Sequence, residues 1–203
     1  MTAGLGAEIA VGPPLQRLLD AWSVGTVLSF AALRGDVFPA GRVGWAELYV
    51  NPTALPRARI ASQPRVGPDD AVLAELAAGT WDPARTVLLS ASLREVERLG
   101  WGGEGTARIT ADEPTRVVVE AHVSGPAWLV LADTWYPGWR ADVNGKPARI
   151  HRANLCQRAV HLPAGDHTVT FRYHATAYRR GLAISLTALA FWLAALLITT
   201  RRR

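Results

Sequence analysis

The longest apolar run of the chain lies near its C-terminus. No charged residue occurs from Gly181 to Thr200, where the sequence reads GLAISLTALAFWLAALLITT. In an α-helix this run is about 30 Å long, which is the thickness of the hydrocarbon core of a bilayer. A helix buried in a soluble core is usually shorter and apolar on one side only. The run therefore predicts a transmembrane helix over 181–200.

Residues 1–100 alternate between short helical and short strand patterns. The sequence GPPLQRLLDAW, 12–22, predicts a helix whose first turn accommodates the prolines. The sequence GPDDAVLAELAAG, 67–79, predicts a second helix that ends at Gly79 in the C′ position. Strand composition is found at 23–33, 41–50 and 82–92. We expect a small α+β segment over 1–100 that packs on the following domain and ends at a glycine-rich joint, Leu99 to Gly105.

Strand patterns dominate from residue 107 to residue 178. In the hairpin 139–152, Asn144-Gly145 supplies the positive φ angles of a type I′ turn. A second hairpin covers 157–173, with apolar and polar residues alternating along its return strand. Short strands with turn signals at this spacing predict an antiparallel β-sandwich, jelly-roll-like, over 107–178. The expected fold is therefore mainly β with some α, followed by one C-terminal transmembrane helix.

The charge distribution argues against a nucleic-acid partner. The formal net charge is +5, but the arginines are dispersed through strand-like and turn-like segments rather than gathered into a stripe. The clusters Arg179-Arg180 and 201–203 bracket the apolar run, as expected for cations that anchor a membrane helix at the headgroups. Cys156 is the single cysteine, which excludes an intramolecular disulfide and a multi-cysteine metal site.

The flanking charges and the N-terminal segment give conflicting indications of which side of the membrane residues 1–180 occupy. Three arginines after the apolar run and two before it favour a cytoplasmic tail, 201–203, with residues 1–180 outside the cytoplasm. The N-terminal segment MTAGLGAEIAVGPPLQRLLD has neither the basic start nor the apolar core of a signal peptide. Two explanations follow: a tail-anchored protein with a cytosolic domain, or the C-terminal end of a longer membrane protein with earlier helices.

The segment DTWYPGW, 133–139, concentrates aromatic side chains at a Pro-Gly turn. Trp135, Tyr136 and Trp139 form either a stacking platform for pyranose rings or the packing at a strand end, and packing is the favoured interpretation. Asp133 either caps the turn by accepting backbone N–H groups, which is favoured, or acts on a sugar by binding a hydroxyl group or serving as an acid.

The region joining the two hairpins is a second candidate binding site, because it contains Arg152 and Arg158. A guanidinium group can fork onto a phosphate or a carboxylate, so these residues form a candidate contact with an anionic polymer. Fixing the turn through side-chain to backbone bonds is the favoured interpretation.

The sequence predicts no catalytic residue, metal site or cofactor site. Glycoside hydrolysis requires two carboxylates about 5 to 9.5 Å apart across a cleft, and nothing places Asp133 and Asp142 face to face. The histidines lack the i, i+4 spacing and the neighbouring carboxylates of a zinc site: His151, His161, His167 and His174. There is also no G-x-S-x-G elbow, phosphate-binding loop or dinucleotide fingerprint.

These motifs together resemble the C-terminal end of YfhO-type bacterial membrane proteins. In that family a D-x-x-Y-P-G-W segment leads to a D-G-K or N-G-K hairpin, an arginine-alanine-asparagine turn, a P-A-G-x-H turn and a final membrane helix. The corresponding elements here are Asp133, 136–139, 144–146, 152–154 and 163–167. Upstream, LLDAWSVGTVLSF and NPTALPRARI are similar to the family's strand and turn patterns, so the resemblance covers nearly all of residues 15–200.

The resemblance implies many-helix membrane proteins similar to C-type glycosyltransferases, which use polyprenyl-phosphate sugars to decorate envelope polymers. Their catalytic acidic residues are expected in an early extracytoplasmic loop that this chain does not contain. We therefore expect a non-catalytic, extracytoplasmic portion of such a protein in the bacterial cell membrane, with a structural or acceptor-presenting role. The implied partners are the lipid bilayer, upstream catalytic helices and an envelope glycan or polyprenyl-phosphate sugar. The alternatives are a stand-alone membrane-anchored carbohydrate-binding module and a non-functional truncated remnant.

Overall fold

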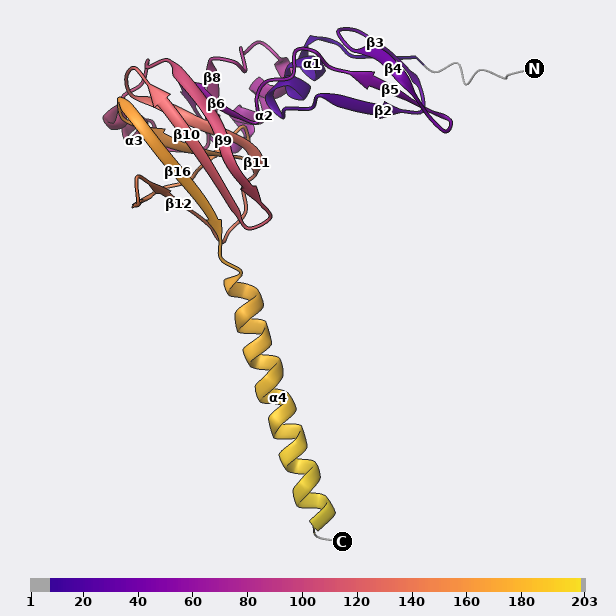
Figure 1. The fold of residues 1–203 in the computed structure, drawn as a ribbon, viewed down its shortest axis with the longest axis vertical. Coiled ribbons are helices and arrows are strands. Elements are labelled where there is room, and N and C mark those ends of the chain that lie inside the picture. The colour runs from indigo at the N-terminus through magenta and orange to yellow at the C-terminus, as the bar shows by residue number, and fades with distance from the viewer. Residues whose placement is uncertain (1–7, 202–203) are drawn as a thin grey trace, which may run out of the picture.

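The protein consists of a β-rich body, a smaller group of strands beside it and one long helix (Figure 1). The computed structural model describes the backbone of residues 8–201 and the side chains of residues 8–175, 178 and 181–192. The long helix, α4 (Thr176–Arg201), continues from the last strand and projects from one end of the body, which we call the foot. Mainly β structure with some α-helix is the fold class that the sequence predicts.

The first layer of the body is an antiparallel five-stranded sheet in the order β13-β12-β16-β10-β9. Its strands are β9 (Gly105–Glu113), β10 (Arg116–Val123), β12 (Trp139–Val143), β13 (Lys146–Ala148) and β16 (Gly165–Tyr173). The hairpin of β12 and β13 turns at Asn144 and Gly145, whose φ angles are 51° and 77°. The positive φ angles predicted for this Asn-Gly turn are thus confirmed.

The second layer is a six-stranded sheet in the order β6-β11-β15-β14-β8-β7. Its strands are β6 (Ala58–Ala61), β7 (Gln63–Val66), β8 (Thr86–Leu89), β11 (Ala127–Thr134), β14 (His151–Ala153) and β15 (Gln157–Leu162). Strands from both sides of the expected joint at 99–105 share this sheet, because β6 pairs with β11. At its edge β7 and β8, which lie outside the range predicted as an antiparallel sandwich, are parallel. The helix α2 (Asp69–Ala78) supplies the crossover that parallel strands require.

One hydrophobic core lies between the inner faces of the two sheets. Alternate positions of the strands that border it supply it, as the two-residue period of a strand dictates. Its fully buried members include Val119, Val169 and Phe171 of the five-stranded sheet and Leu129, Leu131 and Leu162 of the six-stranded sheet. The two sheets therefore pack as layers, and the ends of their strands are fixed relative to each other at the foot.

Residues 8–50 form a group of strands that extends sideways from the body, here called the N-terminal arm (Figure 1). Its strands are β1 (Glu8–Ala10), β2 (Thr26–Ser29), β3 (Ala32–Arg34), β4 (Phe38–Val43) and β5 (Ala46–Val50). β1 and β3 pair in parallel, and the other three form a sheet in the order β2-β5-β4. The strands predicted at 23–33 and 41–50 are thus each interrupted by a turn.

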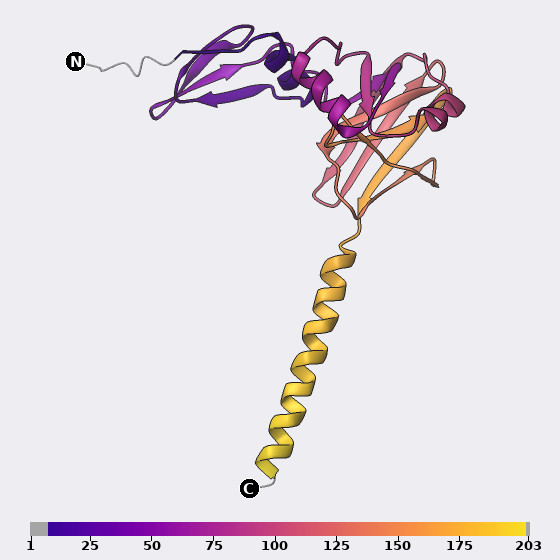
Figure 2. The ribbon, with the colours of Figure 1, turned by 180° about the vertical axis from the view of Figure 1, so that it is seen from behind.

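The short helices agree only in part with the sequence patterns. The predicted helices are present as α1 (Pro13–Ala21) and α2, and Gly79 ends α2 in the left-handed region with a φ of 59°. Figure 2 shows α2, in magenta, between the N-terminal arm and the sheets. The helix α3 (Leu93–Leu99) has no counterpart among the predicted elements.

The apolar run near the C-terminus is helical, as predicted, and lies within α4. Among the residues that the structure describes, no helix combines the length and the apolar character that crossing a bilayer requires. The predicted span continues through 193–200, whose side chains lie outside the described residues. The side chains of Arg179, Arg180 and 201–203 lie outside them as well, so the transmembrane helix and its charged flanks stay predictions from the sequence.

Candidate functional site

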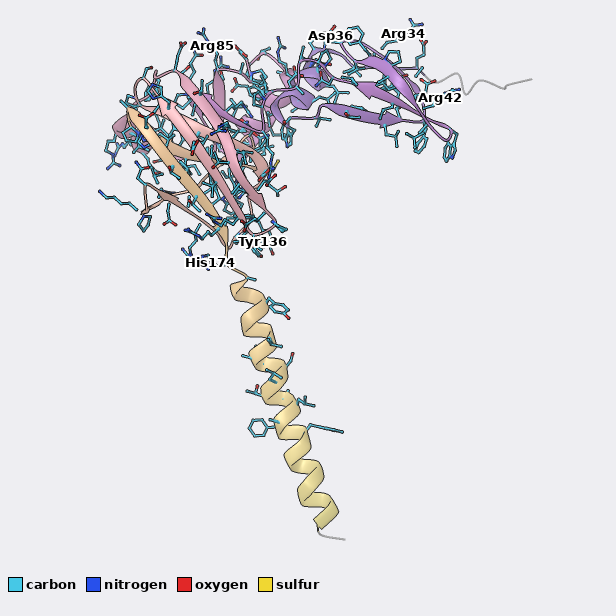
Figure 3. The ribbon with its side chains drawn as sticks, viewed as in Figure 1. Arg34, Asp36, Arg42, Arg85, Tyr136 and His174 are labelled. Atoms are coloured by element: carbon cyan, nitrogen blue, oxygen red, sulfur yellow. The ribbon has the colours of Figure 1, made fainter. Side chains whose placement is uncertain are left out.

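The segment of the chain that carries the candidate aromatic residues lies at the foot of the body. It connects β11 to β12, and Figure 3 shows Tyr136 beside His174, next to the start of α4. A groove of about 640 Å³ is present there. Aromatic and cationic side chains line it and define what we call the aromatic groove: Trp135, Tyr136, Trp139, Arg140, Arg149, Arg172 and His174.

The three candidate rings of the aromatic groove differ in exposure. Tyr136 is 58% exposed, whereas Trp135 and Trp139 are half-buried. Tyr173, at the end of β16, joins them, with its ring centroid 5.5 Å from that of Trp139 and 6.3 Å from that of Tyr136. Trp139 also packs against the main core. The structure therefore brings the predicted rings together, and Tyr136 presents the most open face to a ligand.

Asp133 lies behind these rings and is held by two arginines. Its Oδ1 accepts a bond of 2.6 Å from Arg57 Nε, and its Oδ2 accepts bonds of 2.8 Å from Arg57 Nη2 and 2.5 Å from Arg158 Nη2. Arg57 also donates from Nη1 to Asp112 at 2.6 Å. The hydrogen bonds to Asp133 and Asp112 raise the pKa of Arg57. Both carboxylate oxygens of Asp133 are thus engaged by arginine side chains, which leaves little capacity for a sugar hydroxyl; the expected capping by backbone N–H groups is not seen among the described residues.

Arg158 is an internal support for the aromatic groove. Its side chain is only 2% exposed, and its guanidinium carbon lies 3.8 Å from the centroid of the Trp139 ring and 5.3 Å from that of Phe171. Burial lowers the pKa of Arg158 to about 10, so the group remains a cation at neutral pH. Among the described residues, its Nε and Nη1 have no hydrogen-bond partner. Arg158 therefore depends on Asp133 for its charge partner and cannot reach a polymer in solvent.

Arg152, the other candidate anion contact, is partly exposed on β14. It forms an ion pair with Asp69 of α2, and its guanidinium carbon lies 5.9 Å from the centroid of the Trp135 ring. The adjacent turn is fixed by Asn154, which is fully buried and has a φ of 47°. Its Oδ1 accepts a bond of 3.0 Å from the backbone N–H of Leu88. The side-chain to backbone bonds expected of Arg152 and Arg158 are not seen among the described residues, because both arginines pair with aspartates; Asn154 instead bonds the backbone of β8.

Asp142 and two of the histidines make contacts within the protein. Asp142 pairs with Arg172 at 2.7 Å. His151 and His161 lie at the edges of the Trp128 ring, and burial lowers the pKa of both. Within the described part of the chain, no group of three or more histidine, cysteine, aspartate or glutamate residues is arranged to hold a metal ion.

Two components of this region could not be predicted from the sequence. Arg57 lies 76 positions from Asp133 along the chain, so no local pattern could link them. Tyr173 was visible only as part of an alternating strand, and its proximity to Trp139 follows from the pairing of β12 with β16.

The comparisons with known proteins agree with the motif pattern around this site. Residues 104–185 match the family model of the bacterial membrane protein YfhO. The match includes β9 to β16 and the first residues of α4, and therefore the whole of the segment from Asp133 to Trp139. No curated protein and no solved structure matches the chain. Over residues 104–185, the chain is therefore similar to the family of the bacterial membrane protein YfhO.

Proposed function

We propose that the chain is a non-catalytic, extracytoplasmic portion of a YfhO-type envelope glycosyltransferase, in which the aromatic groove presents an acceptor glycan. The proposal rests on the aromatic groove, where aromatic and arginine side chains lie together at the foot, next to the start of α4. Sugar rings stack on aromatic faces, and arginine side chains donate several hydrogen bonds to ring oxygens and acidic groups. The catalytic helices are expected outside this chain.

A presenting role fits the carboxylates better than a catalytic one does. Asp133 is locked between Arg57 and Arg158, and Asp142 is paired with Arg172. A general acid in a glycosidase requires a raised pKa and free access to the glycosidic oxygen. These two residues instead make the hydrogen bonds that hold the groove in shape, which is the role of a rigid platform.

The proposed location rests on the sequence of α4 and on its place in the fold. The stretch 181–200 contains no charged residue and is long enough to cross the hydrocarbon core. Because α4 begins directly after β16, a bilayer that contains 181–200 lies next to the foot and the aromatic groove. The arginines at 201–203 support a cytoplasmic tail, with the body on the opposite side of the membrane.

Binding of isolated envelope glycan to the full chain in detergent tests the proposal. Tyr136→Ala is the informative variant, because the ring is largely exposed and its loss leaves the core intact. We expect affinity to fall about three- to tenfold, the effect of one aromatic contact. Trp45→Ala is the matched control, since Trp45 is 78% exposed in the N-terminal arm, away from the groove. Equal binding by the wild type and Tyr136→Ala would exclude the groove as the glycan site.

A stand-alone carbohydrate-binding module would use the same groove, and the size of the native protein separates the two proposals. An antibody against residues 107–178 should detect, in native membranes, a species several times larger than 21.9 kDa. A native species of 21.9 kDa would favour the binding module instead.

A further inference from the structure

The outer face of the five-stranded sheet carries a row of three arginines at the foot. Arg140 of β12 is directly opposite Arg172 of β16, and Arg172 is directly opposite Arg116 of β10. Side chains that are directly opposite in an antiparallel pair project from the same face of the sheet. The chain neighbours Ala141 and Phe171 are buried in the core, so these arginines face outwards. We call Arg116, Arg140 and Arg172 the arginine row.

The arginine row is unfavourable by itself. Like charges directly opposite each other destabilise a strand pair. Two of its members have partial compensation, because Arg172 pairs with Asp142 at 2.7 Å and Arg116 pairs with Glu113 at 3.3 Å. For Arg140, the structure of the described residues shows no ion pair and no side-chain hydrogen bond. The row therefore retains an excess of positive charge that an external anion would neutralise.

The position of the arginine row next to α4 indicates which kind of anion it binds. Arg172 lies one residue before the end of β16, and α4 begins at Thr176. His174, exposed at the same end, and Tyr136 lie beside the start of α4 (Figure 3). Arginines and aromatic rings at the end of a membrane helix are the composition found at the level of lipid headgroups. Arginine recognises phosphate oxygens through several N–H donors at once.

We propose that the arginine row binds the phosphate of anionic phospholipids and so holds the foot against the membrane surface. The proposal rests on the proposed function, because it requires that α4 enters the bilayer. Each basic residue near an anionic membrane surface contributes about 1 kcal/mol of binding free energy. Arg140 is the member whose charge has no internal partner, so its contribution to lipid binding is the most direct.

Native mass spectrometry of the full chain in a neutral, phosphate-free detergent tests the proposal. The chain is incubated with equimolar phosphatidylglycerol and phosphatidylcholine, and the ratio of the two bound lipids is measured. We expect the wild type to retain more phosphatidylglycerol, and Arg140→Ala to lower the ratio about fivefold. Arg85→Ala is the matched control, because Arg85 is exposed at the end of the body far from α4 (Figure 3). Arg85→Ala should leave the ratio unchanged.

A stability measurement separates lipid binding from a structural role of Arg140. Without anionic lipid, Arg140→Ala should unfold at the same or a higher urea concentration than the wild type, because it removes a like-charge opposition. A lower midpoint together with a lower lipid ratio would show that Arg140 supports the fold, and would overturn the proposal. An unchanged lipid ratio in a well-folded Arg140→Ala protein would overturn it as well.

Extraction of native membranes with alkaline carbonate distinguishes a failure of the lipid-binding proposal from a failure of the proposed function. A chain that remains in the membrane but shows no dependence on Arg140 would refute lipid binding alone. Release of the chain by carbonate would refute the membrane location, and with it both proposals. Displacement of phosphatidylglycerol by a phosphate-containing envelope polymer at equal phosphate concentration would identify the polymer as the preferred ligand, and would also overturn the lipid assignment.

Discussion

Replacing Asp133 with alanine should destabilise the body strongly, because it leaves Arg158 buried without a charge partner. Arg158 is 2% exposed, and within the described part of the chain its one hydrogen bond is the bond from Nη2 to Asp133. Removing one partner of a buried ion pair costs about 3–5 kcal/mol. Asp133 is itself 17% exposed, which permits some hydration of the site. We therefore expect the free energy of unfolding to fall by about 3–4 kcal/mol.

The second arginine adds little to this loss. Arg57 is about one-third exposed and keeps its bond to Asp112 when Asp133 is removed. Exposed ion pairs contribute about 0–1 kcal/mol. Asp133→Asn, which retains a hydrogen-bond acceptor but no charge, should lose about 2 kcal/mol.

Urea unfolding of the full chain in detergent, followed by tryptophan fluorescence, measures these differences. A loss of 3–4 kcal/mol corresponds to a decrease of roughly 1–2 M in the urea midpoint. Asp142→Ala is the control, because the Asp142–Arg172 pair is about half exposed and should contribute less than about 1 kcal/mol. Asp133→Leu combined with Arg158→Met replaces the pair with apolar groups and should recover most of the stability.

Two outcomes would refute this reasoning. If Asp133→Ala lost no more stability than Asp142→Ala, the buried charge of Arg158 would be satisfied in another way. If the double variant were less stable than Asp133→Ala, the loss would come from packing rather than from the unpaired guanidinium group.

Three further predictions concern the turns and the histidines. Gly79→Ala should lower the free energy of unfolding by more than about 2 kcal/mol, because a Cβ would lie 2.5 Å from the backbone of α1 and the φ of 59° would be strained. Gly145→Ala is the control, because its Cβ would meet nothing within 4 Å and only the backbone strain would remain. Equal losses of stability in urea unfolding would exclude the clash at Gly79. Asn154→Ala should cost about 1–3 kcal/mol, since it leaves a buried backbone N–H unsatisfied, and faster amide exchange at Leu88 would report the lost bond. Burial lowers the pKa of His151, so the unfolded chain takes up this proton first, and the stability present above about pH 6.5 is lost as the pH falls. His151→Phe should flatten that decline in thermal unfolding, and an unchanged slope would assign the decline to other groups.

The aromatic residues of the groove have two roles, sugar binding and packing of the fold, and different residues serve each role. Trp139 packs on the core and lies over Arg158, so its removal should impair folding. Tyr136 is open to solvent and makes a tilted contact with Tyr173. Variants at Tyr136 therefore report on ligand binding, whereas variants at Trp139 report mainly on stability.

The local elements of this protein could be predicted from the sequence because short-range physics decides them. Asn144-Gly145 forms its turn because both residues accept a positive φ, and Gly79 ends α2 for the same reason. Two-residue alternation placed the core face of β16 correctly, but the hairpin predicted over 157–173 is wrong, because β15 and β16 belong to different sheets. α3 was missed because a seven-residue helix has too few turns to show a clear period, and it ends at the glycine-rich stretch that resembled a flexible joint.

Tertiary structure alone decided how distant segments meet at the foot. Arg57 reaches Asp133 because β6 pairs with β11, and neither residue carries a local signal of the other. The arginine row depends on the register of β12, β16 and β10, since a shift of one residue would move each arginine to the opposite face of the sheet. The sequence by itself determined most of the strands and turns and the helices α1 and α2, because those choices depend on neighbouring residues. Strand pairing determined which charges and rings share a surface, because that depends on contacts between residues far apart in the chain.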